Sequence, residues 1–349
     1  MNAIPPIAAP GRADHGHQHK SALVDAFGRQ ITYLRLSVTD RCDLRCQYCM
    51  GEDMQFMSRE QLLTSDELVA IANSFIDRGI STIRLTGGEP LTRRDFPAIA
   101  AAIGQRIGCG LAELTLTTNA TQLATHAVAI ARAGITRINV SVDTLDPLDF
   151  RMITRGGDIA KVLTGISAAQ DAGIKVRINM VAMSGFNDRC LSAMLDWCDG
   201  QGFDLALIEA MPMGSVSDIR SASHIALVPF IAKAIGDRTL HAIGHRTAGP
   251  ARYVTIDGWN VRIGLITPIS NNFCSACNRI RMTADGKVHG CLGHDSAIDL
   301  AAAWRRGGQD ALDPLIASLM RTKAERHQFA FRKSIADTGP VRHMSVTGG

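Results

Sequence analysis

Three cysteines lie within eight residues of one another near the start of the chain. Cys42, Cys46 and Cys49 stand in the stretch DRCDLRCQYCM, residues 40–50, with three and then two residues between them. Thiolates grouped in this way hold metal ions or iron–sulfur clusters, and three ligands on a four-iron cluster would leave one iron open. An open coordination position distinguishes a metal site that binds a reactant from a closed, structural one. The spacing also allows zinc with a distant fourth ligand.

A second group of three cysteines lies near the C-terminus. It consists of Cys274, Cys277 and Cys291, in the stretch NNFCSACNRIRMTADGKVHGCLG. Zinc is an open alternative here too, because His289 or His294 could complete a set of four ligands. Arg279 and Arg281 follow closely, however, and guanidinium is the group suited to bidentate recognition of phosphate. The two arginines therefore favour a cluster that binds an anionic substrate over a structural zinc ion.

The composition argues against some other classes of function. At 349 residues the chain could form a barrel-sized domain with an appendage, or two domains. It has 37 Lys and Arg against 33 Asp and Glu, a balance that indicates neither nucleic-acid binding nor a membrane anchor. No stretch approaches the roughly 18 apolar residues of a membrane span, and MNAIPPIAAP does not resemble a signal peptide. We expect a cytoplasmic protein whose nine cysteines stay reduced.

The elements that must position these cysteines form a recurring strand–helix unit from about residue 31. The candidate strands are residues 32–38, 82–88, 114–119, 137–143, 175–183 and 204–211, and the candidate helices are residues 64–79, 93–106, 122–133, 158–172 and 188–200. In the first helix, Thr64 and Glu67 are spaced as a capping box and Gly79 is placed to end it. Strict alternation predicts an α/β fold with parallel strands and right-handed crossovers. In such folds ligands gather beyond the carboxyl ends of the strands, where the first cysteines lie.

The sequence pattern divides the chain into three predicted regions. Residues 1–22 are rich in Pro, Gly, Ala and His and should form a disordered tail. Residues 23–215 should form the parallel array, either an open doubly wound sheet or an incomplete barrel. In residues 216–349 the alternation fades, and we expect an appended domain that closes one side of the array.

The first cysteine motif carries a family resemblance. C-x3-C-x2-C, with Tyr48 before the last cysteine and a position after the first strand, resembles the radical S-adenosylmethionine (SAM) family. In that family the open iron binds SAM, and an electron from the reduced cluster splits the sulfonium to give a 5′-deoxyadenosyl radical. TGGEP after the second strand is similar to the family's motif for the methionine part of SAM; Gly87 and Gly88 would permit close approach of a ligand. The resemblance implies an incomplete (β/α)6 barrel, similar to a TIM barrel, with a C-terminal extension carrying a second [4Fe–4S] cluster.

From about residue 25 to its end, the chain resembles the GTP 3′,8-cyclase branch of this family. The features that carry the resemblance are the C-terminal C-x2-C-x-R-x-R, the later lone cysteine and the terminal Gly348-Gly349. The branch performs the first step of molybdenum cofactor biosynthesis: the ribose 3′-hydrogen of GTP is abstracted and the carbon radical attacks guanine C8. The resemblance implies that the second cluster binds the base and that the Gly-Gly tail reaches the active site. It thus gives catalytic roles to Arg279, Arg281, Gly348 and Gly349.

The resemblance also implies the residues that contact each ligand. SAM would contact Tyr48, Gly88, Ser141 and Met211. GTP would contact Arg35, Arg84, Thr117, Arg177 and the segment Arg279-Ile280-Arg281. Independent support comes from Arg35, Arg84 and Arg177, which lie inside strands of an otherwise apolar array, where a guanidinium is costly to bury unless it meets an anion. No G-x-x-x-x-G-K-[ST] phosphate loop occurs as an alternative.

The chain departs from the family pattern in four places. The family usually has Lys where Arg177 stands, Gly at Ala120 and Pro at Gly51, and MPMG at residues 211–214 replaces the commoner acidic segment.

For partners, the resemblance implies GTP as substrate, an electron donor such as flavodoxin or ferredoxin, and cyclic pyranopterin monophosphate synthase downstream. We expect no membrane and no nucleic acid, and a homodimer is left open. Two alternatives remain: a peptide-maturing radical SAM enzyme with an auxiliary cluster, and a zinc-containing nucleic-acid-binding protein.

Overall fold

The centre of the protein is a run of parallel strands that follow one another in chain order. The computed structural model describes residues 22–329 and 340–348, so the predicted tail lies outside the described residues apart from Ala22, as does Gly349. The parallel strands are β1 (Tyr33–Ser37), β2 (Thr82–Thr86), β3 (Glu113–Thr118), β4 (Arg137–Ser141), β5 (Lys175–Ala182) and β6 (Asp204–Glu209). Every candidate strand is confirmed, and the parallel order β1 to β6 is the one that the alternation predicted.

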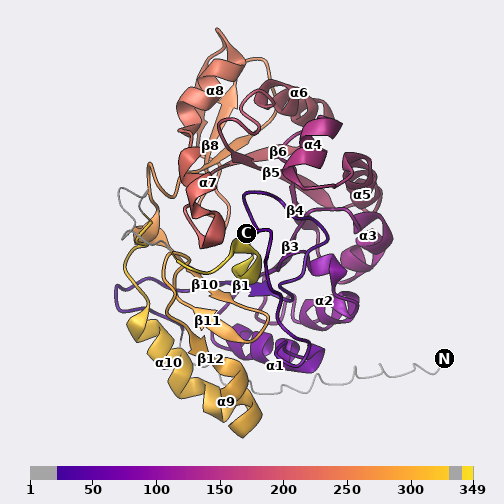
Figure 1. Ribbon diagram of the computed structural model, residues 1–349. Coiled ribbons are helices and arrows are strands. Elements are labelled where there is room, and N and C mark those ends of the chain that lie inside the picture. The colour runs from indigo at the N-terminus through magenta and orange to yellow at the C-terminus, as the bar shows by residue number, and fades with distance from the viewer. Residues whose placement is uncertain (1–21, 330–339, 349) are drawn as a thin grey trace, which may run out of the picture.

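Helices cover the outer side of these strands (Figure 1). They are α1 (Ser65–Ile76), the short 3-10 helix η1 (Pro90–Thr92), α2 (Phe96–Gly104), α3 (Leu123–Arg132), α4 (Pro147–Ile153), α5 (Ile159–Asp171) and α6 (Leu191–Gln201). The capping box of α1 is present, with Thr64 and Glu67 each bonded to the other's backbone N–H. The sequence pattern missed α4, although Asp146 caps it and Pro147 occupies its first turn.

The C-terminal region, from Gly214 onward, adds strands to both edges of the array. Its strands are β7 (Leu240–Ile243), β8 (Arg252–Ile256), β9 (Ile263–Ile266), β10 (Arg279–Met282), β11 (Lys287–His289) and β12 (Ile298–Asp299). Its helices are η2 (Gly214–Val216), α7 (Ser217–Ala222), α8 (Leu227–Ile235), η3 (Cys274–Ala276), α9 (Leu300–Gly307), η4 (Asp310–Leu312), α10 (Asp313–Thr322) and α11 (Met344–Thr347). The sheet of the described residues runs β12-β11-β10-β1-β2-β3-β4-β5-β6-β9-β8-β7.

This order shows where the C-terminal region joins the array. It extends both edges, because β10 pairs in parallel with β1 and β9 pairs in parallel with β6, and the expected closure of one side stays a prediction. Both edges of a six-stranded open array present unpaired backbone groups, and each edge is covered here. The α/β fold with an incomplete barrel is confirmed, while the predicted division of the chain at residue 215 stays a prediction.

The two faces of the central strands have different chemistry. On β1, Leu34 and Leu36 pack in the hydrophobic core, whereas Tyr33 and Arg35 line a cavity on the other face. Because side chains alternate along a strand, one face packs against the helices and the other is free to carry polar groups. The fold therefore collects polar residues of several strands on one concave surface.

Candidate active site

One cavity of about 300 Å³ collects nearly all the predicted site residues. Those that line it are Arg35, Cys42, Cys46, Tyr48, Cys49, Arg84, Gly88, Thr117, Ser141, Arg177, Met211, Cys274, Cys277, Arg279, Arg281 and Cys291. Ile280 and Gly348 are not among the lining residues, and Gly349 lies outside the described residues. The side chain of Ile280 packs in the hydrophobic core, so only its backbone could serve a ligand. The carbonyl oxygen of Gly348 accepts a hydrogen bond from Arg281 Nη1 at 2.9 Å, which places this end of the tail beside the cavity.

The first triad, Cys42, Cys46 and Cys49, lies on the loop that follows β1. The loop that follows β2 packs against it: Gly88 N–H donates to the Thr39 carbonyl at 2.8 Å and Glu89 N–H to the Arg41 carbonyl at 2.7 Å. A Cβ on Gly88 would collide with the Arg41 carbonyl oxygen. The glycine is therefore required for the approach of two protein loops, whereas the sequence suggested only the approach of a ligand.

The thiols of the first triad lie in surroundings that keep them protonated until a metal displaces the proton. Burial, and next to it the charge of Glu89, raises the pKa of Cys42. Burial raises the pKa of Cys46 as well, and the charges of Cys49 and Asp143 act in the same direction. A coordinating cation reverses this balance, since a metal-bound thiol is deprotonated outright.

Tyr48 is held by two buried charged residues that sequence reasoning missed. Its hydroxyl donates to Asp143 Oδ2 at 2.5 Å, and burial raises the pKa of Asp143 to about 6. Arg220 Nε donates to the Tyr48 carbonyl at 2.5 Å and Arg220 Nη1 to the Met211 carbonyl at 3.0 Å. Arg220 thereby joins two residues predicted to contact SAM. Asp143 ends a candidate strand, a signal that could have found it, but nothing in the sequence singles out Arg220.

Glu89 of TGGEP is a further buried carboxyl near the first triad. Its Oε1 accepts from Leu91 N–H at 3.0 Å and from the Thr118 hydroxyl at 2.8 Å, and its Oε2 accepts from Asn119 N–H at 2.6 Å. Burial raises the pKa of Glu89 to about 7 despite these donors. The carboxyl ties the loops after β2 and β3 to each other.

The second triad, Cys274, Cys277 and Cys291, lies among cations. Burial raises the pKa of Cys277, but the charges of Arg279 and Lys323 outweigh it, so that the pKa is lowered. Lys323 is 3% exposed, and its Nζ lies 3.7 Å from Cys277 Sγ and donates to the Gly290 carbonyl at 2.7 Å. Arg29, from the segment before β1, donates to the Cys274 carbonyl at 2.8 Å. The cations beside Cys277 favour its thiolate, whereas burial raises the pKa of Cys291.

The histidines proposed as alternative zinc ligands do not line the cavity. His289 Nδ1 is 3.0 Å from the Ser296 carbonyl oxygen, and His294 Nε2 is 2.9 Å from that of Arg326. In the described residues, no three His, Cys, Asp or Glu side chains are grouped so that they could hold one metal ion. A cubane cluster does not require such a group, because each cysteine ligates a different iron.

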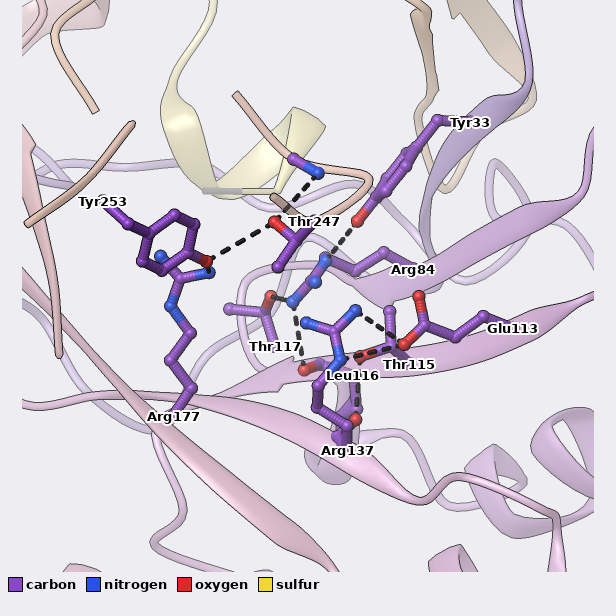
Figure 2. A network of polar contacts seen from close by, with 11 residues as sticks. Tyr33, Arg84, Glu113, Thr115, Leu116, Thr117, Arg137, Arg177, Thr247 and Tyr253 are labelled. Carbon is purple, nitrogen blue, oxygen red and sulfur yellow. Dashed lines mark hydrogen bonds and ion pairs between the residues drawn. The ribbon is translucent and has the colours of Figure 1, made fainter. Parts of the chain in front are cut away.

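Three arginines that line the cavity, Arg84, Arg137 and Arg177, come from separate strands and lie close together (Figure 2). Arg84 Nε donates to the Tyr33 hydroxyl at 2.5 Å and Arg84 Nη1 to the Thr117 hydroxyl at 3.2 Å. Arg177 Nη1 donates to the Tyr253 hydroxyl at 2.8 Å. Arg137 is paired with Glu113 at 2.6 Å, so it brings its own counter-ion. The remaining cationic surface can attract a polyanion.

Comparison with known proteins decides the family. Residues 36–198 match the Radical SAM superfamily, and residues 203–329 match Molybdenum Cofactor Synthesis C. A GTP 3′,8-cyclase of Erythrobacter litoralis is 50% identical over 94% of this chain and 99% of its own length. One of Rhizobium etli is 47% identical over 94% of each chain. This chain belongs to the GTP 3′,8-cyclase family.

One solved structure agrees in fold. SuiB of Streptococcus suis bound to S-adenosylmethionine has a TM-score of 0.54 and 16% sequence identity, and the match covers 80% of this chain and 65% of that one. As a GTP 3′,8-cyclase family member, the chain is a radical SAM enzyme, which confirms the family predicted from the first cysteine motif. None of the helices in the described residues is long and apolar enough to cross a membrane.

The residues of this family member fit the cofactors that the family implies. Both cysteine triads line the cavity. Arg177 lines it as well, and its Nε and Nη2 are buried and have no hydrogen-bond partner in the described residues. Thiolates are the ligands that iron–sulfur clusters take, and unpaired guanidinium donors suit phosphate. SAM and an iron–sulfur cluster are therefore consistent with the donor set.

Local packing accommodates three departures from the usual GTP 3′,8-cyclase pattern. Ala120 has a φ of 63°, in the left-handed region that favours glycine, at a cost of about 1 kcal/mol. A Cβ on Gly51 would lie 2.7 Å from the Ser215 hydroxyl oxygen. Gly214, which ends MPMG, donates its N–H to the Pro340 carbonyl at 2.9 Å and so joins this segment to the C-terminal tail.

Proposed function

We propose that this cavity converts GTP to (8S)-3′,8-cyclo-7,8-dihydroguanosine 5′-triphosphate, the first step of molybdenum cofactor biosynthesis. The observation that carries the proposal is the joint lining of one cavity by two cysteine triads and by arginines of several strands. One triad alone would suit many radical SAM reactions. The second triad, with its arginines, adds a place for an anionic nucleotide.

The first triad would hold a [4Fe–4S] cluster, and SAM would contact Tyr48, Gly88, Ser141 and Met211. Together the bound cluster and SAM supply the radical that abstracts hydrogen. The chain's own task at this end is to fix the ligand and to exclude water. Tyr48 is 8% exposed and is held by Asp143 and Arg220, so its position is set by buried charges before any ligand binds.

The second triad would hold another cluster, which binds the guanine base, and the arginines would bind the triphosphate. Arg35 pairs in register with Arg281 on one side and with Arg84 on the other. Burial, and next to it the charge of Arg281, lowers the pKa of Arg35. Burial and the charge of Arg279 lower the pKa of Arg281 to about 10. A triphosphate would relieve this repulsion, which supports GTP over a neutral substrate.

The tail contributes to the same region. Gly348 accepts from Arg281, and a Cβ on Gly348 would collide with the Thr86 side chain, so a larger residue could not take this place without a shift. We assign Arg279, Arg281, Gly348 and Gly349 to the substrate end of the reaction.

One experiment tests the proposal. The protein is reconstituted anaerobically with iron and sulfide, reduced, and given SAM with and without GTP, and 5′-deoxyadenosine and cyclised nucleotide are quantified by chromatography. We expect more 5′-deoxyadenosine with GTP than without it. Zinc bound in place of iron would support the nucleic-acid-binding alternative. Cleavage of SAM that is indifferent to GTP would support the peptide-maturing one.

Further partners belong to this proposal. A flavodoxin or ferredoxin would supply the electron, and cyclic pyranopterin monophosphate synthase would take the product. The cytoplasmic location and a homodimer stay predictions as well; the first follows from thiols that must stay reduced.

A further inference from the structure

We propose that Tyr253 and Gly264 are positioning residues that direct the guanidinium of Arg177 toward the phosphates of the nucleotide. The inference rests on the proposed function, because it takes GTP as the occupant of the cavity. It concerns two residues of the C-terminal region that no sequence motif singled out.

Tyr253 fixes one end of the Arg177 guanidinium. Arg177 is 8% exposed, its Nη1 donates to the Tyr253 hydroxyl at 2.8 Å, and its guanidinium carbon lies 5.3 Å from the centre of the Tyr253 ring. The phenol ring and its hydroxyl thus hold the fork by stacking and by a hydrogen bond at once. Figure 2 shows the ring beside the guanidinium, with Arg84 and Arg137 reaching the same region from other strands.

The other donors of Arg177 are left for a ligand. Its Nε and Nη2 are buried and have no hydrogen-bond partner among the described residues. The carboxylate of Asp204, which acts on Arg177 electrostatically, already accepts from Arg262 at 2.8 and 2.9 Å. Buried donors without partners are costly, and an anion in the cavity would satisfy them.

Gly264 makes room for this arrangement. It lies on β9 directly opposite Tyr253 on β8, and a Cβ at this position would lie 2.5 Å from Arg177 Nη2. Any larger residue would push the fork out of its place beside the ring. Two of the three strands that the C-terminal region adds at the β6 edge, β8 and β9, therefore support a residue of β5.

The electrostatic surroundings decide the kind of ligand. Arg84 and Arg137 both act on Arg177 as like charges. A neutral base would leave that repulsion in place, whereas a phosphate would remove it. A lysine at this position would present a point charge that has no planar fork to stack on the ring. The phenol should therefore matter when Arg stands at position 177 and not when Lys does.

The test is a double-mutant cycle on the anaerobically reconstituted holoenzyme without SAM. Dissociation constants for GTP are measured by calorimetric titration, and for guanosine by competition, in the wild type, Tyr253→Phe, Arg177→Lys and the double variant. We expect Tyr253→Phe to raise the dissociation constant for GTP about tenfold when Arg177 is present and less than about twofold in the Arg177→Lys background. The dissociation constant for guanosine should not change. Cluster absorbance and thermal unfolding check that each variant is folded.

A second pair of variants tests the support independently. Gly264→Ala should weaken GTP binding about as much as Tyr253→Phe does. Gly244→Ala is the control and should leave GTP binding unchanged, because it lies at an exposed site where a Cβ meets nothing within 4 Å. The inference would be overturned if Tyr253→Phe weakened the binding of GTP and guanosine equally. It would also be overturned if the effect on GTP binding were as large in the Arg177→Lys background. If the wild type failed to bind GTP at all, the proposed function would fail instead.

Discussion

The first triad lies beside carboxylates, whereas the second triad lies beside cations, although both line one cavity. Around the first, burial and the charges of Glu89 and Asp143 disfavour thiolates. Around the second, Arg279 and Lys323 lower the pKa of Cys277 against the effect of burial. Cysteines at different spacings thus have different charged neighbours, although burial raises the pKa of Cys291 as it raises those of the first triad.

The difference matches the charges of the two ligands in the proposed function. SAM carries a sulfonium cation, and nearby carboxyls suit it, whereas GTP carries several negative charges and needs the arginines. The contrast teaches that the cysteines determine which cofactor can bind, while the charged residues around them determine which reactant joins it.

Loss of one cysteine should have the largest effect. Cys46→Ser should abolish both SAM cleavage and cyclised product, because the radical would no longer form. Cys291→Ser should leave SAM cleavage largely intact and abolish product, since only substrate binding would be lost. Chromatography of both products checks this, and full product formation by Cys291→Ser would remove the second cluster from the mechanism.

Removal of a cavity arginine should have the next largest effect. Arg281→Ala should lower kcat/KM for GTP by roughly a thousandfold, about 4 kcal/mol, because a buried charge that binds the substrate is lost. Cleavage of SAM without GTP should change little. Arg305→Ala, which removes a half-exposed partner of Glu67, is the matched control and should change kcat/KM less than about twofold. Equal losses in the two variants would contradict the proposed role of Arg281.

Glu89, the buried carboxyl near the first triad, should make the stability of the protein depend on pH. Its pKa is raised to about 7 in the folded chain, so its contribution to stability is fully present below the unfolded pKa and is lost as the pH rises through 7. Between pH 4.5 and 8 the wild type should lose about 3 kcal/mol more free energy of unfolding than Glu89→Gln. Denaturant unfolding of the metal-free protein at several pH values measures this, and parallel pH profiles would argue against a buried charge at Glu89.

Lys323, beside the second triad, should have a smaller effect, which is on the midpoint potential of the second cluster. Replacing Lys323 with Met should make the midpoint potential of the second cluster more negative by on the order of 60 mV, because the reduced cluster would lose a nearby positive charge. The first cluster should be unaffected. Redox titration followed by electron paramagnetic resonance separates the two, and Lys287→Met, at an exposed lysine paired with Asp285, is the control. An unchanged potential would show that Lys323 acts only through its bond to Gly290.

Much of the fold and of the site could be predicted from local patterns. Alternating strands and helices gave the parallel order β1 to β6, and Thr64 and Glu67 marked the start of α1, because periodicity and capping act over a few residues. The cysteine spacings and the intrastrand arginines pointed to the residues that the cavity collects. The short α4 was missed, since seven residues are too few to display a helical period.

The sequence by itself determined the ligand types, the family and the central strands, because each depends on residue identity and short spacing. Only the tertiary structure decided that β10 lies beside β1 and that β9 and β8 bring Gly264 and Tyr253 to Arg177. It alone also placed Arg220 on Tyr48 and Lys323 on Cys277. These contacts join residues far apart in the chain, and their energies depend on burial and distance, which no local pattern encodes.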